Sequence, residues 1–273
     1  MLVVYSPAQV APAQGESPSA AKPGPVVEAW RRIDPELELV EPVPVTTAEL
    51  ARAHDPTYVE LILSCRKANG FGTRDPEVAR SLPYTSGAML TAARLALARG
   101  GIVAAPVSGF HHAGWDFGGG FCTFNGLMVT ARTLLADGVA RRVGILDFDY
   151  HYGNGTEDIL RQLGRDGIVH YTAGGEWERP QQARAFLKDV PHYLDLMDAC
   201  DVVLYQAGAD AHVDDPLGGF LTDAELERRD RLVFEGLTAR GVPVAWNLAG
   251  GYQQPLSKVV AIHEATYRAA MAV

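Results

Sequence analysis

The sequence contains little cysteine and no long hydrophobic run. Its three cysteines, Cys65, Cys122 and Cys200, are far apart and odd in number, so they form neither a disulfide framework nor a Cys-x-x-Cys zinc site. A reducing compartment, and hence the cytoplasm, is the expected location. No apolar run approaches the roughly 18 residues that a membrane span requires. The N-terminal MLVVYSPAQV also lacks the basic region of a signal peptide.

Basic residues are outnumbered, with 24 Lys and Arg against 33 Asp and Glu, which gives a net charge of -9 at pH 7. Proteins that bind the phosphate backbone usually carry a basic stripe, so nucleic acid is not an expected partner. The chain has 273 residues, 47% of them hydrophobic, which is one large domain or two small ones. With a mean hydropathy of -0.02, the composition is typical of a soluble globular protein.

Apolar runs typical of buried strands alternate along the chain with segments of helical spacing. Strands are expected at 2–5, 102–105, 143–146, 168–172, 201–206 and 242–248. Helices are expected at 26–33, 46–52, 58–67, 86–99, 123–136, 156–163, 180–199, 222–240 and 255–270, and loops at 6–25 and 69–85. The alternation has no composition break or internal repeat. It predicts a single α/β domain over residues 1–273, with a parallel, doubly wound sheet.

Four of the expected strands are followed by residues that can bind a metal or move a proton: Asp147, Asp149 and His151; His111 and His112; Asp210; and Tyr252. In a parallel sheet the carboxyl ends of the strands share one edge, so these side chains can converge on one crevice. Any one of them alone could be a cap, a turn or a surface residue, and the carboxylates could mark a solvated strand end. Two buried carboxylates without a Lys or Arg nearby are naturally compensated by a cation. Two Asp and one His would make a zinc site with an open position, and the other histidines could move the protons of a bound water.

The polar strand ends fall within five motifs: GFHHAG, GGGFCTFN, ILDFDYHYGNGTEDI, QAGADAHVDDPLGG and NLAGGY. In this order, from Gly109 to Tyr252, the sequence resembles the histone deacetylase superfamily, which includes the acetylpolyamine amidohydrolases. A weaker match, RAHDPTYVELI, lies upstream. The resemblance implies an arginase-like three-layer α/β/α fold with a mainly parallel, eight-stranded sheet. It also implies zinc-dependent hydrolysis of an N-acetyl or N-acyl amine such as acetyl-lysine, acetylpolyamine or a small acylated metabolite.

The resemblance also implies a set of metal ligands. Asp149, His151 and Asp210 match the ligands of one zinc ion per chain. Family members also bind potassium near the central strand, through positions that match Asp147, Asp149 and His151. One zinc and one potassium site are therefore expected at this strand end.

Catalytic roles are implied in the same way. His112 matches the general base, and His111 matches the electrostatic partner that protonates the leaving amine. Asp147 matches the carboxylate behind His111, and Asn154 stands behind His112, as in class II members. Tyr252 matches the tyrosine that polarises the acyl oxygen. We expect these five residues to form the catalytic group.

The substrate entrance is where this sequence departs from the family. Gly120 and Phe121 match the tunnel wall, and Leu217 falls where a glutamate favours polyamines in some members, so leucine favours acyl-lysine or a neutral amide. The usual His-Pro-Glu-Arg-Pro run is missing, and the region reads GESPSAAKPGPVVEAW. The stretch after Thr172, which usually supplies a second tunnel aromatic and an extra strand, is cut to AGGEWERPQQ. Trp177 could form a substitute wall there, but it is expected to pack the shortened loop. A wider, shallower entrance that prefers small amides is predicted, unless a partner subunit of a homo-oligomer completes the wall.

Two other functions are compatible with an arginase-like fold. A manganese ureohydrolase of the arginase-like fold would carry a further Asp/His pattern for a second metal. A non-catalytic binding homologue would be expected to lack a ligand, a histidine or the tyrosine, and none is missing.

Overall fold

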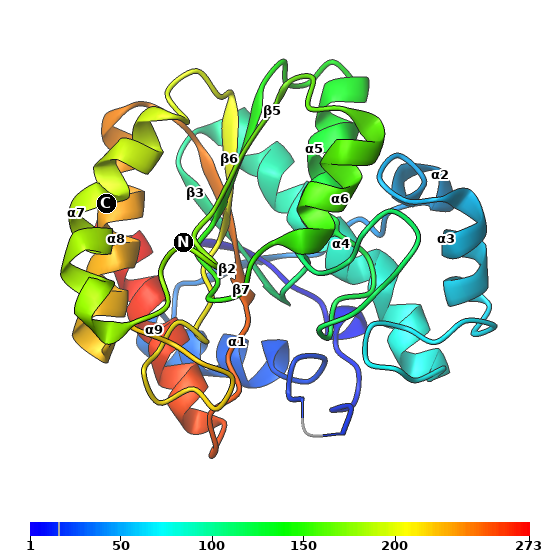
Figure 1. The fold of residues 1–273 in the computed structure, drawn as a ribbon, viewed down its shortest axis with the longest axis horizontal. Coiled ribbons are helices and arrows are strands. Elements are labelled where there is room, and N and C mark those ends of the chain that lie inside the picture. Colours follow the sequence, from blue (N-terminus) through cyan, green and yellow to red (C-terminus); the bar gives the residue numbers. More distant parts are fainter. Residues whose placement is uncertain (16) are drawn as a thin grey trace.

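The computed structural model describes residues 1–15 and 17–273. Glu16, inside the segment expected as a loop, lies outside the described residues. Within that part of the chain, seven strands form one parallel sheet in the order β2-β1-β3-β7-β6-β4-β5 (Figure 1). The strands are β1 (Leu2–Val4), β2 (Glu38–Val40), β3 (Ile102–Ser108), β4 (Val143–Asp147), β5 (Ile168–Thr172), β6 (Val202–Gln206) and β7 (Val244–Ala249). The family resemblance implies eight strands, and the seven seen here agree with the shortened segment after β5.

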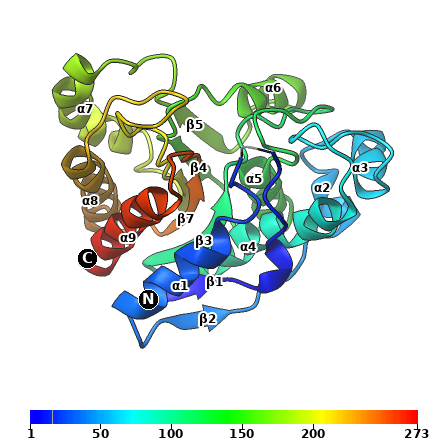
Figure 2. The same cartoon turned by 90° about the horizontal axis from the view of Figure 1, so that it is seen from below.

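Helices cover both faces of the sheet, which gives three layers (Figure 2). One face carries α1 (Pro23–Ile33), α7 (Ala183–Asp195), α8 (Asp223–Ala239) and α9 (Ser257–Met271). The other carries α2 (Thr47–Leu50), α3 (Pro56–Leu63), α4 (Pro76–Arg99), α5 (Gly126–Ala136) and α6 (Asn154–Leu163). Two 3-10 helices, η1 (Pro7–Gln9) and η2 (Pro180–Gln182), complete the described elements. The three-layer α/β/α prediction is confirmed.

The strand period divides the core between the two faces. In β6, Val203 and Tyr205 pack with the helices of the first face, whereas Val202 and Leu204 pack with those of the second. All five residues of β6 are buried, as expected for a parallel strand covered on both sides. The described chain has no helix that is long and apolar enough to cross a membrane.

The largest differences from the predicted elements are one helix start and one strand. The segment 69–85 was expected to be a loop, but α4 begins at Pro76, with the Asp75 side chain capping it through Glu77 N. The helix then continues through Pro83, because burial of Val78 and Leu82 against the core outweighs the loss of one backbone donor. The edge strand β2 was not predicted, since it is short and only partly buried.

Candidate active site

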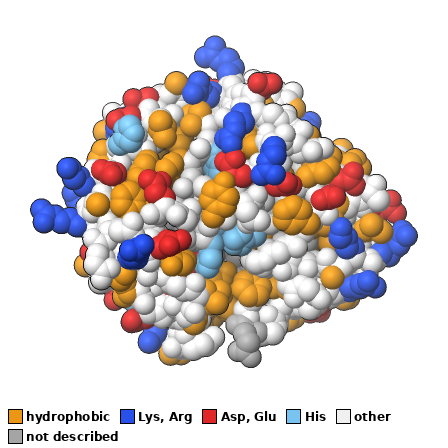
Figure 3. Space-filling view, in the orientation of Figure 1, with side chains coloured by type: hydrophobic (Ala, Val, Ile, Leu, Met, Phe, Trp, Pro, Cys, Tyr) orange, Lys and Arg blue, Asp and Glu red, His pale blue; other side chains and the backbone are white. Residues whose placement is uncertain are grey.

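The site lies at the carboxyl ends of β3, β7, β6 and β4, which are neighbours in the sheet. These strands lead respectively into the His111-His112 pair, the turn with Tyr252, the loop with Asp210, and the segment from Asp147 to His151. Figure 3, in the orientation of Figure 1, shows histidine side chains near the centre of the drawn face of the molecule, with hydrophobic side chains beside them. The structure therefore brings the predicted residues together on one edge of the sheet.

The alternating stretch after β4 is held by side-chain contacts and not by strand pairing. β4 ends at Asp147, where its Oδ1 accepts from Asp149 N at 3.1 Å, and Asp149 Oδ1 in turn accepts from His151 N at 3.0 Å. Phe148 is buried whereas Tyr152 is 47% exposed, so this stretch does not alternate as a continued strand would. Two successive carboxylate-to-amide turns take the place of strand alternation in directing these side chains.

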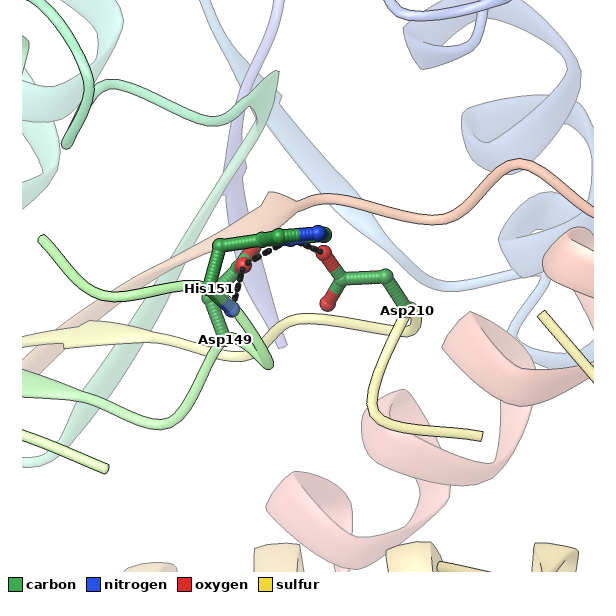
Figure 4. Close-up of side chains that lie close together, drawn as sticks. All are labelled: Asp149, His151 and Asp210. Atoms are coloured by element: carbon green, nitrogen blue, oxygen red, sulfur yellow. Dashed lines mark hydrogen bonds and ion pairs between the residues drawn. The ribbon is translucent and has the colours of Figure 1, made fainter. Parts of the chain in front are cut away.

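Asp149, His151 and Asp210 form a compact group of potential metal ligands (Figure 4). Their ligand atoms all lie within 4.8 Å of one another, with His151 Nδ1 at 3.0 Å from Asp210 Oδ2 and 3.4 Å from Asp149 Oδ1. Both carboxylates are buried and also accept backbone amides, Asp149 from Gly250 and Asp210 from Tyr150. In the part of the chain that the structure describes, no other group of three or more His, Cys, Asp or Glu side chains could hold a metal ion.

The electrostatics of this group suit a bound cation. Burial and the neighbouring Asp149 carboxylate raise the pKa of Asp210 to about 7. Hydrogen bonds to Asp149 and Asp210 raise the pKa of His151 to about 10. Two carboxylate oxygens and one imidazole nitrogen are donors that zinc accepts, and a divalent cation would relieve the repulsion between the buried acids. The residues present therefore fit a zinc ion.

The two adjacent histidines have different partners. His111 Nδ1 lies 2.7 Å from Asp147 Oδ2, and His112 Nδ1 lies 2.6 Å from Asn154 Oδ1. Burial opposes the charged form of His111, but Asp147 and Asp149 outweigh it and raise its pKa to about 9. Burial and the charge of His111 lower the pKa of His112. These surroundings favour the charged form of His111 and the neutral form of His112, although their rings are only 4.1 Å apart.

Backbone geometry fixes the loop that passes over His112. Gly120 has φ +52°, and a Cβ placed there would lie 2.3 Å from His112 Cδ2. The next residue, Phe121, also has a positive φ of 66°. Its backbone amide donates to Gly70 O at 3.1 Å, so the 69–73 segment and the Gly120 loop support each other.

A row of aromatic rings, from Phe71, Phe121 and Tyr252, lines one side of the site. The Phe121 ring lies 5.4 Å from that of Tyr252, and the Phe71 ring lies 5.9 Å from that of Phe121. Burial raises the pKa of Tyr252, so its hydroxyl stays a neutral donor. Phe71 was not predicted, because its segment reads only as a loop; its position between Gly70 and Gly72 was the one local signal. A cavity of about 50 Å³ opens beside this row, between Phe71, Phe121 and Phe110.

The remaining predicted entrance residues lie at the rim or below it. Leu217 is 47% exposed, in a loop where Asp215 accepts from both Leu217 N and Tyr252 N. Trp177 is buried, and its Nε1 donates to the hydroxyls of Tyr171 and Tyr193. The expectation that Trp177 packs the shortened loop is confirmed.

Two buried cations, which the sequence patterns did not single out, hold the strand ends from outside the site. Arg229 of α8 donates through Nη1 to Phe148 O at 3.1 Å and to Gly208 O at 2.8 Å. These carbonyls flank the segments that carry Asp149 and Asp210. Lys22 makes equivalent contacts at the end of β7.

Comparisons with known proteins agree with this geometry. Residues 22–173 match the family model described as histone deacetylase domain. The chain is 32% identical over 263 residues to an uncharacterized protein of Picosynechococcus sp.. The aligned region covers 87% of this chain and 86% of that protein. The chain is 30% identical over 172 residues to acetylpolyamine amidohydrolase 1 of Pseudomonas aeruginosa, and this aligned region covers 52% of this chain and 48% of that protein. The crystal structure of acetylpolyamine aminohydrolase from Burkholderia pseudomallei superposes with a TM-score of 0.78 at 20% identity, covering 100% of this chain and 99% of that one.

Proposed function

The chain belongs to the histone deacetylase family, and from this premise we propose that it is a zinc-dependent amidohydrolase that removes an acetyl or related acyl group from an amine. The observation that carries the proposal is the convergence of three potential metal ligands, two histidines with separate hydrogen-bond partners and one tyrosine at the ends of four adjacent strands. Residues 1–273 would act as one catalytic domain. The chemistry requires no covalent nucleophile.

The metal would be held by Asp149, His151 and Asp210, as one zinc ion per chain. When bound, zinc supplies a Lewis acid that polarises an amide carbonyl and acidifies a water molecule. The potassium ion expected near Asp147, Asp149 and His151 stays a proposal that rests on the family resemblance. Asp147 Oδ1 already accepts from Asp149 N and Gln206 Nε2, so a cation there would draw on other oxygens.

The histidine pair would carry the proton transfers. His112 is neutral, and because its Nδ1 faces the acceptor Asn154, its Nε2 is free to take a proton from the attacking water. His111, charged and held by Asp147, would stabilise developing negative charge and protonate the leaving nitrogen. Water adds to the acyl carbon, the C–N bond breaks, and the products are a carboxylic acid and an amine. The Tyr252 hydroxyl would donate to the developing oxyanion.

The substrate would be acetyl-lysine, an acetylpolyamine or a small acylated metabolite, and the entrance favours the small amides. Phe71 lengthens the wall that Phe121 begins. On the side of His151, the shortened segment presents Gly174 and Gly175, which offer no side chain to enclose a substrate. Each methylene left in water forgoes about 0.8 kcal/mol of binding, so long acyl-lysine chains gain less here. Exposed Leu217 adds no charge that would select a polyamine.

The alternatives lose support from the same observations. A two-manganese ureohydrolase needs a second set of ligands, and among the described residues only Asp149, His151 and Asp210 cluster as potential ligands. A binding homologue would not need two histidines held by separate Asp and Asn partners. We expect the enzyme to act in the cytoplasm, with neither nucleic acid nor a membrane as a partner. If a second subunit completes the wall of the substrate entrance, the enzyme would be a homo-oligomer.

The deciding experiment is a panel of acylated amines incubated with zinc-loaded protein, with free amine and carboxylic acid measured as products. Small amides should be turned over faster than acetyl-lysine peptides. Faster turnover of the peptides would overturn the entrance argument, and no turnover of any amide would overturn the function.

A further inference from the structure

Lys22 is fully buried just before α1, and its ammonium faces backbone carbonyls. Nζ donates to Ala249 O at 2.6 Å and to Gly250 O at 3.1 Å. Among the residues that the structure describes, no carboxylate lies within salt-bridge distance of it. Burying a lysine without a paired acid is unfavourable, so a lysine in this place points to a role beyond packing.

The two carbonyls belong to the turn that leads from β7 to Tyr252. Ala249 has φ +53°, in the left-handed region that non-glycine residues rarely adopt, so the turn needs support from its surroundings. In the same turn, Gly250 N donates to Asp149 Oδ2 at 2.9 Å, and Tyr252 N donates to Asp215 Oδ2 at 2.7 Å. The ammonium thus holds two peptide units of the turn that leads to Tyr252.

We propose that Lys22 is a positioning residue for amide hydrolysis, which fixes the 249–252 turn and thereby the Tyr252 hydroxyl. The proposal rests on the proposed function. An ammonium suits the task because it has three donors and no acceptor, so it can bridge two carbonyl oxygens that would otherwise be buried with fewer partners. Burial lowers the pKa of Lys22 to about 8, while Asp210, Asp149 and Asp215 oppose that change, so the cation persists at neutral pH.

The first test compares Lys22→Met and Lys22→Arg with Lys258→Met, which changes an exposed lysine on α9 and serves as the matched control. Because a small displacement of a catalytic group can cost about a hundredfold in rate, Lys22→Met should lower kcat by roughly 10- to 100-fold while KM changes little. The zinc content should stay at one per chain. Lys22→Arg should recover most of kcat, since its guanidinium can also donate to two carbonyls. Wild-type kcat in Lys22→Met would overturn the proposal.

A double-mutant cycle separates positioning of Tyr252 from general stabilisation. If Lys22 acts through the tyrosine, Lys22→Met should cost far less kcat in a Tyr252→Phe background than in the wild type. Equal fold losses in the two backgrounds would overturn the proposal. Should Lys22→Met not fold, Lys22→Gln, which keeps one donor without the charge, takes its place in the same cycle with the same criteria.

A binding measurement tests the Lys22 proposal independently of the proposed function. If the wild type hydrolyses no acylated amine, the proposed function fails, but the Lys22 proposal is still tested by calorimetric binding of acetohydroxamic acid to zinc-loaded protein. Its carbonyl can accept from the Tyr252 hydroxyl, so Lys22→Met should weaken binding in the wild-type background and leave it unchanged in Tyr252→Phe. Equal affinity of wild type and Lys22→Met would contradict the positioning role.

Discussion

Acid should destabilise this protein through one buried imidazole, His54. Its ring is fully buried, Nδ1 lies 2.8 Å from Gly114 O, and Nε2 lies 2.8 Å from Asn125 N. Since Asn125 N can only donate, Nε2 must accept and Nδ1 must donate, which requires the neutral ring. Protonation would break the contact with Asn125, the N-cap of α5.

The pKa of His54 gives the size and direction of the effect. Burial lowers it from 6.5 to about 4. The unfolded chain therefore binds the proton first, so the stabilisation is complete above pH 6.5 and is lost as the pH falls towards 4. At 1.36 kcal/mol for each pH unit of difference, the full loss is about 3 kcal/mol. Between pH 7 and pH 5.5 the same relation gives about 1 kcal/mol.

The assay is urea unfolding of the wild type and of His54→Gln at pH 7 and pH 5.5. Glutamine can donate to Gly114 O and accept from Asn125 N, but it does not titrate, so other acid-sensitive groups cancel in the comparison. The stability of the wild type relative to the variant should fall by about 1 kcal/mol at the lower pH. An unchanged difference between the two proteins would refute the assignment of a neutral, buried His54.

Three further predictions concern the site. His112→Ala should retain one zinc but lose most activity, whereas Asp210→Ala should lose the zinc itself; metal analysis and turnover distinguish the two, and near-normal activity of His112→Ala would exclude it as the base. Tyr252→Phe should lower kcat about a hundredfold or more, as loss of an oxyanion donor does, with zinc content unchanged; a normal kcat would remove the tyrosine from the mechanism. Gly120→Ala should destabilise the fold by about 1 to 2 kcal/mol in urea unfolding, because its φ of +52° disfavours a Cβ that would also meet His112; wild-type stability would contradict that strain.

The sequence predicts the layered fold because strand and helix periods are local. Six of the seven described strands follow from short apolar runs such as Val143–Asp147. The seventh, β2, has no such run, because an edge strand needs little burial. The start of α4 was missed because Pro83 signals a break, and only packing of Val78 and Leu82 in the folded protein overrides that signal.

The site is predicted where its residues lie in motifs at strand ends, as for Asp149 and His112. It is not predicted where contacts join distant parts of the chain. Lys22 reaches Ala249 across 227 positions, and Phe71 meets Phe121 through a loop without periodicity. No local pattern records such contacts, so the support of the active site is visible only in the folded structure.

Zinc-dependent amide hydrolysis can be measured by adding one equivalent of zinc to metal-free protein and following acid and amine release from a small acylated amine. Hydrolysis should appear with zinc, at one bound ion per chain, and should be lost in His112→Ala. Two bound manganese ions with release of urea from a guanidino substrate, or no hydrolysis at full zinc occupancy, would contradict the proposed function.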